Sequence, residues 1–355
     1  MPFAIRPLDR ATLPAWDAFV EAHPDGTFFH RAAWSGVIED AFGHRAHYLL
    51  AERDGAIVGV LPLVHMKTRL FGNTLVSTPF CVYGGPLAVD GETRAALAEH
   101  AAGLLPRLGA SAVEFRFRDA PDSDSDSDWA AGWAAGWAAG PPLHVTFRKA
   151  IEPDHDRNMK AIPRKQRAMV RKGIQNGLTS VCDHDAAVLH RCYAESVRNL
   201  GTPVFPRRYF AILLERFADC ADVVTILDAG KPIASVQNFY FRNEVLPYYG
   251  GGTGEARHRA GNDFMYWEVM RRAAERGCRL FDFGRSKIGT GAYAFKHNWG
   301  FEPSPLHYRW HLAPGAAIPQ NNPSNPKYRL FIGAWKKLPL PVANAIGPLI
   351  VRGLG

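Results

Sequence analysis

Residues 243–284 read NEVLPYYGGGTGEARHRAGNDFMYWEVMRRAAERGCRLFDFG, and this stretch decides the fold. The apolar run that ends in three glycines predicts a strand. NDFMYWEVMRRAAERG predicts a helix that closes at Gly277, and CRLFDFG predicts a second strand. Upstream, DVVTILDAGKPIASVQNFYF predicts two further strands around a turn at Gly230. This order of strands and helix indicates an α/β unit.

The first half of the chain repeats this order. HYLLAERDGAIVGVLPLV predicts two strands joined at Asp54-Gly55, and a later strand-like segment ends in Tyr83-Gly84-Gly85. ETRAALAEHAAGLLPRLG and SAVEFRF then predict a helix and a strand. In both halves the glycine that closes the helix lies five residues before an acidic residue, Glu114 or Asp282. The spacing predicts two copies of one unit, and two unrelated α/β segments are the alternative.

Composition narrows the class of protein and of partner. The 355 residues suffice for two domains, and the formal charge of +8 favours an anionic partner such as a nucleic acid, an anionic lipid surface or a phosphorylated substrate. The start of the chain has no signal-peptide pattern, no apolar run reaches about 18 residues, and the five cysteines form no CxxC pair. We expect a globular protein of the cytoplasm.

Residues 121–142 form a low-complexity loop with a triple Asp-Ser step and three WAAG units. Trp129, Trp133 and Trp137 at a spacing of four predict one helical stripe. The alternative is a repeat expansion that a surface loop tolerates.

Residues 157–172, RNMKAIPRKQRAMVRK, hold seven basic residues and no acidic one. With Pro163 in the first turn and Gly177 at the end, a helix here carries Arg164, Arg167 and Arg171 on one face. That face is suited to phosphates. A solvated basic helix is the alternative.

The glycine-rich stretch from Gly284 to Gly300 matches neither a Walker loop nor a dinucleotide fingerprint. The better anion candidate is the turn at Gly250, Gly251 and Gly252, which we expect to open the helix that begins near Gly261. The sequence has neither a metal-ligand set nor a nucleophile motif, so we predict no metal site. Direct transfer between bound partners remains, and Lys296 is suited to stabilise negative charge in it.

Taken together, the duplicated unit, IPRKQRAMVRKGIQNG, the GGG turn, FDFGRS and GTGAYAFKHNWG resemble the FemAB (Fem/non-ribosomal peptidyltransferase) superfamily. The most specific part is Tyr293, Phe295 and Lys296 with the trailing Trp299-Gly300. The C-terminal AWKKLPLPVANAIGPLIVRGLG is similar to the tail of the subgroup associated with exosortase/PEP-CTERM systems.

The resemblance implies an α/β fold of two tandem GNAT-like domains, with mixed sheets flanked by helices. We expect these domains over residues 1–150 and 151–315, with the probable active site in the second and a tail over 316–355. The resemblance also implies transfer of an acyl or aminoacyl group to an amine, carried by an envelope precursor or a small molecule. In characterised relatives the donor is an aminoacyl-tRNA. This sequence lacks the inserted helical arm that some of them use near tRNA, so an acyl-CoA is the alternative donor. No cofactor is bound permanently.

The expected mechanism is attack of the acceptor amine on the donor carbonyl. In relatives the pair matching Phe295 and Lys296 handles the reacting centre. Asp282 or a water takes the amine proton, and strand-end scaffolding is the alternative for Asp282. The residues expected to bind the donor or its phosphates, or to line the cleft, are Arg164, Lys165, Arg167, Gly250, Gly251, Gly252, Arg285, Ser286 and Tyr293.

Two further expectations concern partners. Trp335, Lys336 and Lys337 beside an interrupted apolar run suit peripheral contact of residues 330–355 with the inner membrane, and packing on the body of the protein is the alternative. We expect no DNA partner. The competing functions are a small-molecule N-acetyltransferase that uses acetyl-CoA and a non-catalytic protein that binds RNA or a membrane surface.

Overall fold

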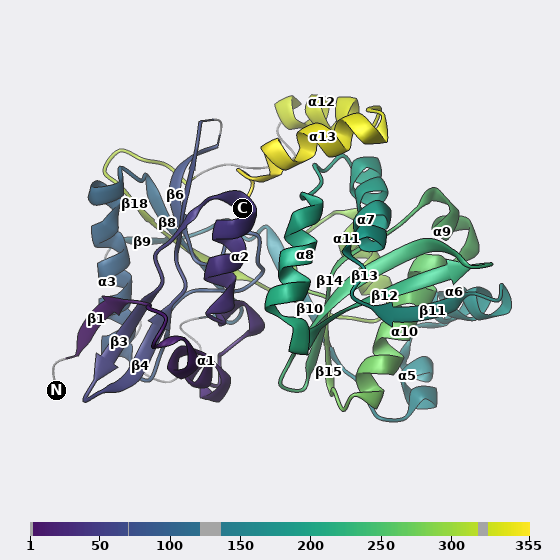
Figure 1. Ribbon diagram of the computed structural model, residues 1–355, viewed down its shortest axis with the longest axis horizontal. Coiled ribbons are helices and arrows are strands. Elements are labelled where there is room, and N and C mark those ends of the chain that lie inside the picture. The colour runs from purple at the N-terminus through teal and green to yellow at the C-terminus, as the bar shows by residue number, and fades with distance from the viewer. Residues whose placement is uncertain (1–2, 70, 121–135, 319–325) are drawn as a thin grey trace. The chain divides into compact units, whose positions relative to one another are not determined.

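The computed structural model describes residues 3–69, 71–120, 136–318 and 326–355 (Figure 1). These residues divide into two compact units. The first holds the described residues within 1–143, 305–320 and 353–355, and the second those within 144–304 and 321–352. The first unit ends before residue 150 because the strand that follows, β10 (His144–Ala150), pairs with β15 (Leu280–Asp282) in the second.

The first unit contains two sheets, in the strand orders β1-β3-β4-β7 and β2-β5-β6-β8-β18-β9. Its strands are β1 (Ala4–Pro7), β2 (Arg45–Ala46), β3 (Leu49–Arg53), β4 (Ala56–Leu61), β5 (Val64–Thr68), β6 (Gly72–Val76), β7 (Leu87–Ala88), β8 (Ala112–Phe117), β9 (Trp137–Ala139) and β18 (His307–Leu312). Its helices are α1 (Leu13–Ala22), the short 3-10 helix η1 (Phe28–His30), α2 (Ala33–Phe42) and α3 (Gly91–Leu108). Strand β18 comes from far along the chain and lies between β8 and β9, so residues that the sequence assigned to the second domain complete the six-stranded sheet of the first unit.

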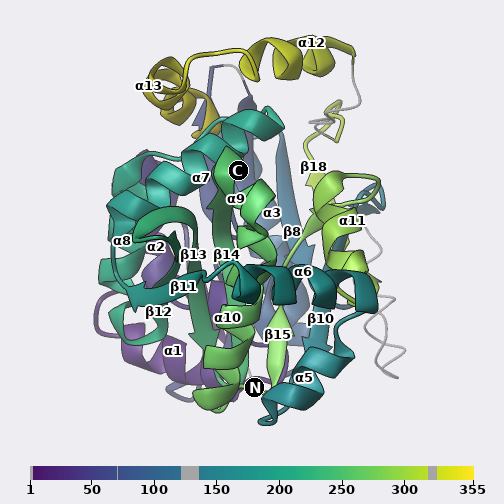
Figure 2. The ribbon, with the colours of Figure 1, turned by 90° about the vertical axis from the view of Figure 1, so that its right-hand side faces the viewer.

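The second unit is built on one sheet in the order β11-β12-β13-β14-β15-β10-β16 (Figure 2). Its further strands are β11 (Thr179–Asp183), β12 (Ala221–Asp228), β13 (Lys231–Phe241), β14 (Glu244–Gly252), β16 (Ser286–Lys287) and β17 (Pro303–Pro305). Its helices are α5 (His155–Ala161), α6 (Arg164–Gln175), α7 (Ala186–Leu200), α8 (Arg207–Arg216), η2 (Ala218–Cys220), α9 (Gly254–Arg259), α10 (Gly261–Glu275), α11 (Gly291–Asn298), α12 (Pro326–Trp335) and α13 (Leu340–Val351).

The two units share a strand, helix and parallel strand that meet in the same way. In the first unit β6 pairs with β8 in parallel at Leu75↔Val113 and Val76↔Glu114, with α3 between them in sequence. In the second, β14 pairs with β15 in parallel at Glu244↔Leu280 and Val245↔Phe281, with α9 and α10 between them. The element order that the sequence predicted is thus present twice, and both parallel contacts are equally short.

Both predicted hairpins are present. Asp54 and Gly55 join β3 to β4, and Ala229 and Gly230 join β12 to β13, all four with positive φ. Residues of this conformation make the tight turn whose twist matches that of the strands.

The expected basic helix is present as α6, with Pro163 at its N-cap, and α5 precedes it as a separate helix. Two local expectations differ from the structure. Tyr83-Gly84-Gly85 lies beyond the end of β6 at Val76 and ends no strand. Trp137 lies in strand β9, where its ring stacks on Phe115 at 4.4 Å, whereas Trp129 and Trp133 lie outside the described residues.

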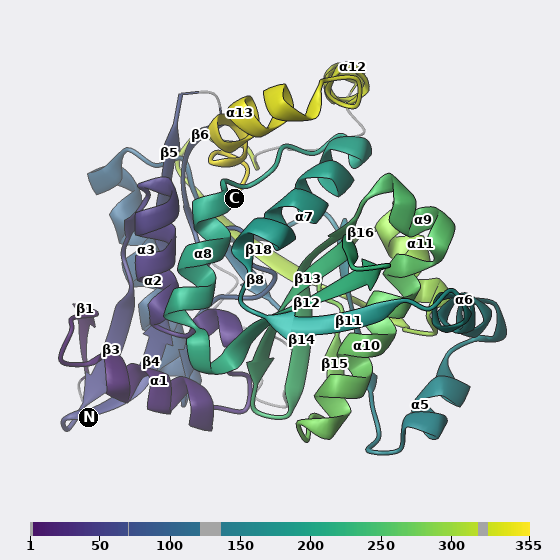
Figure 3. The same cartoon turned by 45° about the vertical axis from the view of Figure 1, so that its right-hand side comes forward.

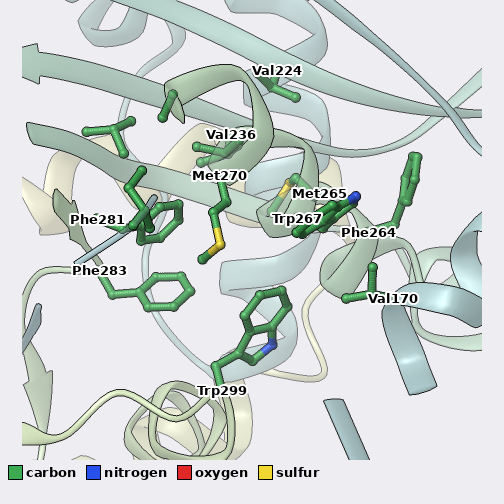
Figure 4. Packing of buried hydrophobic residues seen from close by; sticks show 14 of the residues in the cluster. Val170, Val224, Val236, Phe264, Met265, Trp267, Met270, Phe281, Phe283 and Trp299 are labelled. Atoms are coloured by element: carbon green, nitrogen blue, oxygen red, sulfur yellow. The ribbon is translucent and has the colours of Figure 1, made fainter. Parts of the chain in front are cut away.

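The core of the second unit gathers between its sheet and α10 (Figures 3 and 4). Met265 and Met270 of α10 reach it from the helix, and Val236 and Phe281 reach it from the sheet. Trp299, directly after α11, is fully buried against this cluster. The core therefore fixes α11 against the end of β15. Among the described residues, no helix has both the length and the apolar character to cross a membrane.

Candidate active site

Lys296 joins α11 to the residues that follow β15. Thr290 caps the start of α11, where its Oγ1 accepts from the N–H of Tyr293 at 3.3 Å. One and a half turns later, Nζ of Lys296 donates to three consecutive backbone carbonyls, those of Phe283 at 2.7 Å, Gly284 at 3.0 Å and Arg285 at 3.0 Å. An ammonium group has three donors, so this turn engages all of them.

The surroundings of Lys296 make its charge costly. Burial lowers the pKa of Lys296, the Asp282 carboxylate raises it and the positive charge of Arg285 lowers it, and together these effects bring it to about 7. The three carbonyls favour the ammonium form, because only that form fills all of them with hydrogen bonds. A lysine whose pKa is shifted to near neutrality by burial and by specific charges is typical of a functional site.

Asp282, at the end of β15, is buried and already engaged at both oxygens. Its Oδ1 accepts from the N–H of Gly284 at 2.7 Å and from Thr146 Oγ1 at 3.4 Å. Its Oδ2 lies 3.2 Å from Nε of Arg148, whose guanidinium also donates to Glu244. These contacts hold the turn that Lys296 binds, and they favour the scaffold alternative for Asp282 over the general base.

Aromatic rings position α11 around the lysine. The Phe295 ring lies 5.5 Å from Tyr266 and 6.2 Å from Trp299, so it faces the core. The Tyr293 ring meets Phe147 of β10 edge-on at 5.3 Å. In the Tyr-x-Phe-Lys pattern, Tyr293 and Phe295 thus pack against neighbouring rings, and Lys296 supplies the charged group.

Arg285 and Ser286, which the sequence analysis expects to line the cleft, lie at the end of this turn. Arg285 is half-buried, and its carbonyl accepts from Lys296. Ser286 lies in β16 opposite Val145 of β10 and is buried, with no hydrogen-bond partner for its Oγ among the described residues.

The glycines at the end of β14 have a different role from the one expected. Gly250, Gly251 and Gly252 pair with β13 and form no turn. A Cβ on Gly250 would lie 2.9 Å from Val236 Cγ2, and one on Gly251 would lie 2.6 Å from Ser196 Cβ of α7. Close packing on both faces of the sheet therefore requires glycine here. The expected turn at these positions is therefore absent, and the expected role of the three glycines in binding phosphate stays a prediction.

The start of the following helix is also taken. The N–H of Gly254, the first residue of α9, donates to the Glu195 carboxylate at 2.7 Å. The same N–H would otherwise be available to an anion.

Strand β14 separates from β15 in its second half. The register ends at Val245↔Phe281, although β14 continues along β13 as far as Gly252. Beyond the last shared pair, β14 also carries a bulge, because Gln237 faces Tyr249 while the next residue, Asn238, faces Pro247. Tyr248 is therefore an extra residue. Val245 lies opposite Phe281 and β15 ends at Asp282, so the bulge at Tyr248 lies beyond the carboxyl end of β15, on the side where Lys296 binds.

The basic helix α6 presents its charges outward. Arg164 and Lys165 are exposed, and Arg167 is half-buried and donates to the Lys160 carbonyl at 3.4 Å. The opposite face of α6 packs on α10, where a Cβ on Gly173 would meet Phe264 Cβ at 2.7 Å. Pro163, just before α6, lies beside Gly300, just after α11. The start of the basic helix therefore adjoins the end of the helix that carries Lys296.

One buried residue that the sequence analysis missed holds these parts together. Oδ1 of Asp263 accepts from Gln166 Nε2 of α6 at 2.9 Å and from Trp299 Nε1 at 3.0 Å. Burial raises the pKa of Asp263, and the two hydrogen bonds lower it. Its signal was an aspartate within the apolar run of a predicted core helix. Arg148, the partner of Asp282, and Glu244, the second partner of Arg148, were missed because each lies on a different strand.

Comparison with known families places a transferase domain on this unit. Residues 159–297 match the family model described as "Acetyltransferase (GNAT) domain". The match covers less than half of the chain and runs from α5 to the residue after Lys296. The second unit thus carries a GNAT-type domain, which supports acyl transfer as its chemistry. No curated protein sequence matches the chain.

Solved structures share the whole fold at low sequence identity. The structure titled FemX matches with a TM-score of 0.69 and 16% identity over 93% of this chain and 100% of that one. A tandem GNAT protein from the clavulanic acid biosynthesis pathway matches with a TM-score of 0.53 and 16% identity, over 87% of this chain and 98% of that one. The C-terminal domain of a putative lysylphosphatidylglycerol synthetase from Agrobacterium fabrum matches with a TM-score of 0.53 and 13% identity, over 85% and 92%. The predicted fold, two GNAT-like units in tandem, is confirmed.

Proposed function

We propose that this chain is an acyltransferase that moves an acyl or aminoacyl group from an activated donor to an amine, with its reacting centre at the carboxyl end of β15. The observation that carries the proposal is the position of Lys296, a buried cation just beyond the end of β15, where β14 continues without β15 as a partner. Ligands of α/β sheets bind beyond the carboxyl ends of such strands. The GNAT match over the same residues supports it.

The chemistry follows from the charge that develops. The neutral acceptor amine attacks the donor carbonyl, and a C–N bond forms as the C–O bond of an aminoacyl ester or the C–S bond of a thioester breaks. The amine proton passes to water or to the leaving group, because the contacts of Asp282 engage both its oxygens. In the structure all three N–H donors of Lys296 bind backbone carbonyls. To stabilise the oxyanion, Lys296 gives up one of these hydrogen bonds and donates to the oxyanion in its place.

The basic surface of the second unit indicates which kind of donor it can bind. Exposed basic side chains line α6 at Arg164, Lys165, Arg171 and Lys172. The end of α6 adjoins the end of α9, where Asn176 Nδ2 donates to the Arg259 carbonyl at 3.0 Å. This surface suits a polyanion such as tRNA. Glu195 of α7 accepts from the first N–H of α9, and its negative charge repels a phosphate at that position. This disfavours binding of a CoA phosphate at the start of α9.

The acceptor proposed is an amine-bearing cell-envelope precursor or a small amine. FemX and the synthetase are relatives in fold alone, and the envelope role rests on the resemblance of the sequence motifs. The exosortase-associated subgroup stays a prediction of the same kind.

The test is a transfer assay with a matched pair of lysine variants. The full chain is incubated with an acyl-CoA panel or with aminoacyl-tRNA and a panel of amines, and acylated products are detected by mass spectrometry. The variant is Lys296→Met. The control is Lys149→Met, which removes another lysine that donates to a backbone carbonyl, that of Ala161 at 2.9 Å, and whose pKa burial also lowers.

We expect transfer from one donor class, a loss of at least hundredfold in Lys296→Met, and a loss of less than tenfold in Lys149→Met. Transfer from acetyl-CoA alone makes the chain a small-molecule N-acetyltransferase. Equal turnover of the folded Lys296→Met variant overturns the role of Lys296. Salt-sensitive RNA binding with no transfer from any donor overturns the enzyme proposal in favour of a binding protein.

A further inference from the structure

The helix α13 is apolar on the side that it turns away from the protein. Its inner face is buried at Ala343, Gly347 and Val351, and it packs against α7 and against Val204, whose N would lie 2.9 Å from a Cβ on Gly347. Its exposed positions are Pro341, Val342, Ala345, Ile346 and Leu349, and none of them is polar. A helix on the surface of a globular protein normally turns charged or polar residues outward.

The preceding helix α12 continues this surface. Leu330 is 80% exposed and Phe331 38%, while Trp335 is buried. Ile332 anchors the helix near the end of α7, where its Cγ2 would lie 2.5 Å from a Cβ on Gly201. Both helices belong to the second unit and follow one another along one side of it (Figures 1 and 2).

Exposed apolar side chains are concentrated on these helices. Of the large hydrophobic side chains that are exposed among the described residues, half lie on α12 and α13: Leu330, Phe331, Val342, Ile346 and Leu349. We call these five the apolar outer face. Single exposed apolar residues are ordinary on a protein surface, but a contiguous group marks a binding surface.

The charged side chains of the segment that carries the apolar outer face have one sign. Glu302 is the last acidic residue of the sequence, and the remainder contains neither Asp nor Glu. Lys336 and Lys337 are exposed in the link between α12 and α13, and Arg352 follows α13. Cations beside an apolar helix face are typical of segments that lie on anionic membranes.

We propose that α12 and α13 dock the second unit on an anionic lipid surface, with the apolar outer face in the boundary between headgroups and acyl chains and Lys336 and Lys337 at lipid phosphates. Helix α13 has 12 residues, fewer than the about 20 that cross a bilayer, so it lies along the surface. A second copy of the chain fits less well, because its own lysines would face the same cations. The inference is independent of the proposed acyl transfer.

The test is co-sedimentation of the full chain with large unilamellar vesicles. One set contains phosphatidylcholine and phosphatidylglycerol at about 3:1 and the other phosphatidylcholine alone, chosen to separate the electrostatic from the apolar contribution. The apolar variant is Ile346→Gln/Leu349→Gln. Its matched control is Val89→Gln/Ile174→Gln, which changes two exposed apolar residues elsewhere, 57% and 49% exposed. The charge variant is Lys336→Glu/Lys337→Glu.

We expect the wild type and the control to bind the anionic vesicles, with binding at least tenfold weaker in the apolar variant and in the charge variant. We expect added salt to weaken wild-type binding and binding to phosphatidylcholine alone to be poor. Two results overturn the proposal: no wild-type binding to anionic vesicles, or undiminished binding by the apolar variant. The proposal is also overturned, in favour of self-association, if light scattering shows a dimeric wild type and a monomeric apolar variant and neither binds vesicles.

Discussion

Nζ of Lys296 lies 2.7 Å from the carbonyl oxygen of Phe283, and through this hydrogen bond α11 closes on the residue that follows β15. Lys296 can be identified as a candidate from the sequence, whereas the backbone carbonyl that accepts its hydrogen bond cannot. A buried lysine that donates to three backbone carbonyls affects both the stability of the fold and the reactivity of the site.

Lys296 makes folding stability depend on pH. Burial lowers its pKa to about 7 from 10.5, so between these values the unfolded chain binds one proton more than the folded chain. The free energy of unfolding therefore rises with pH across this window, by up to about 1.4 kcal/mol per pH unit. We expect the melting temperature of the wild type to gain several degrees relative to Lys296→Met between pH 7 and pH 9, measured by calorimetry. A difference that stays constant over this range would show that the folded-state pKa is not depressed.

Asp282→Asn should weaken the fold more than the chemistry. Asparagine keeps an acceptor for the Gly284 N–H but loses the charge opposite Arg148, and we expect a loss of about 1–3 kcal/mol in unfolding free energy with turnover reduced less than tenfold. Arg148→Gln should destabilise to a similar extent in chemical denaturation. A general base would behave otherwise: turnover would fall about 10²–10⁴-fold in Asp282→Asn at unchanged stability.

Gly251→Ala should destabilise the second unit. The new Cβ would lie 2.6 Å from Ser196 Cβ of α7, and overpacking of this kind costs about 1–3 kcal/mol. The control is Gly254→Ala, whose Cβ has its nearest neighbour at 3.6 Å. Denaturant titration should separate the two variants clearly. If Gly251→Ala kept its stability and instead lost affinity for the donor, the glycines would be a phosphate site after all.

The start of α6 should hold the donor more tightly than its end does. Arg164 and Lys165 begin the helix next to Gly300, whereas Arg171 and Lys172 lie near its end, and all four are exposed. We expect Arg164→Gln/Lys165→Gln to raise KM for the donor about tenfold, which corresponds to about 1.4 kcal/mol of binding. Arg171→Gln/Lys172→Gln changes the charge equally and should leave KM within about threefold. Equal effects of both pairs would indicate only the general field of a basic surface.

Local patterns predicted those parts of the fold that short-range chemistry determines. Asp54-Gly55 and Gly230 made their hairpins because the conformation of a tight turn is set by two residues. The period of α10 and the apolar run of β15 were visible for the same reason. Strand β18 was not, because its partners, β8 and β9, lie far away in sequence and nothing within His307–Leu312 signals them.

The candidate site divides in the same way. Lys296 stood out as a residue type in a motif, but its three carbonyl partners have no signature in the sequence. Gly250–Gly252 were expected in a turn but lie in strand β14, because glycine serves a phosphate turn and a close strand contact equally well. Only the neighbours of the missing Cβ, Val236 and Ser196, separate the two explanations.

Strands β8 and β9 lie on either side of β18, so both ends of the low-complexity insertion are held by one strand of the six-stranded sheet. The last WAAG unit supplies Trp137, whose ring closes over Phe115. Gain or loss of one repeat by replication slippage would leave an identical tryptophan at the entry to β9. A chain with one WAAG unit more or fewer would therefore still offer Phe115 a tryptophan to stack on.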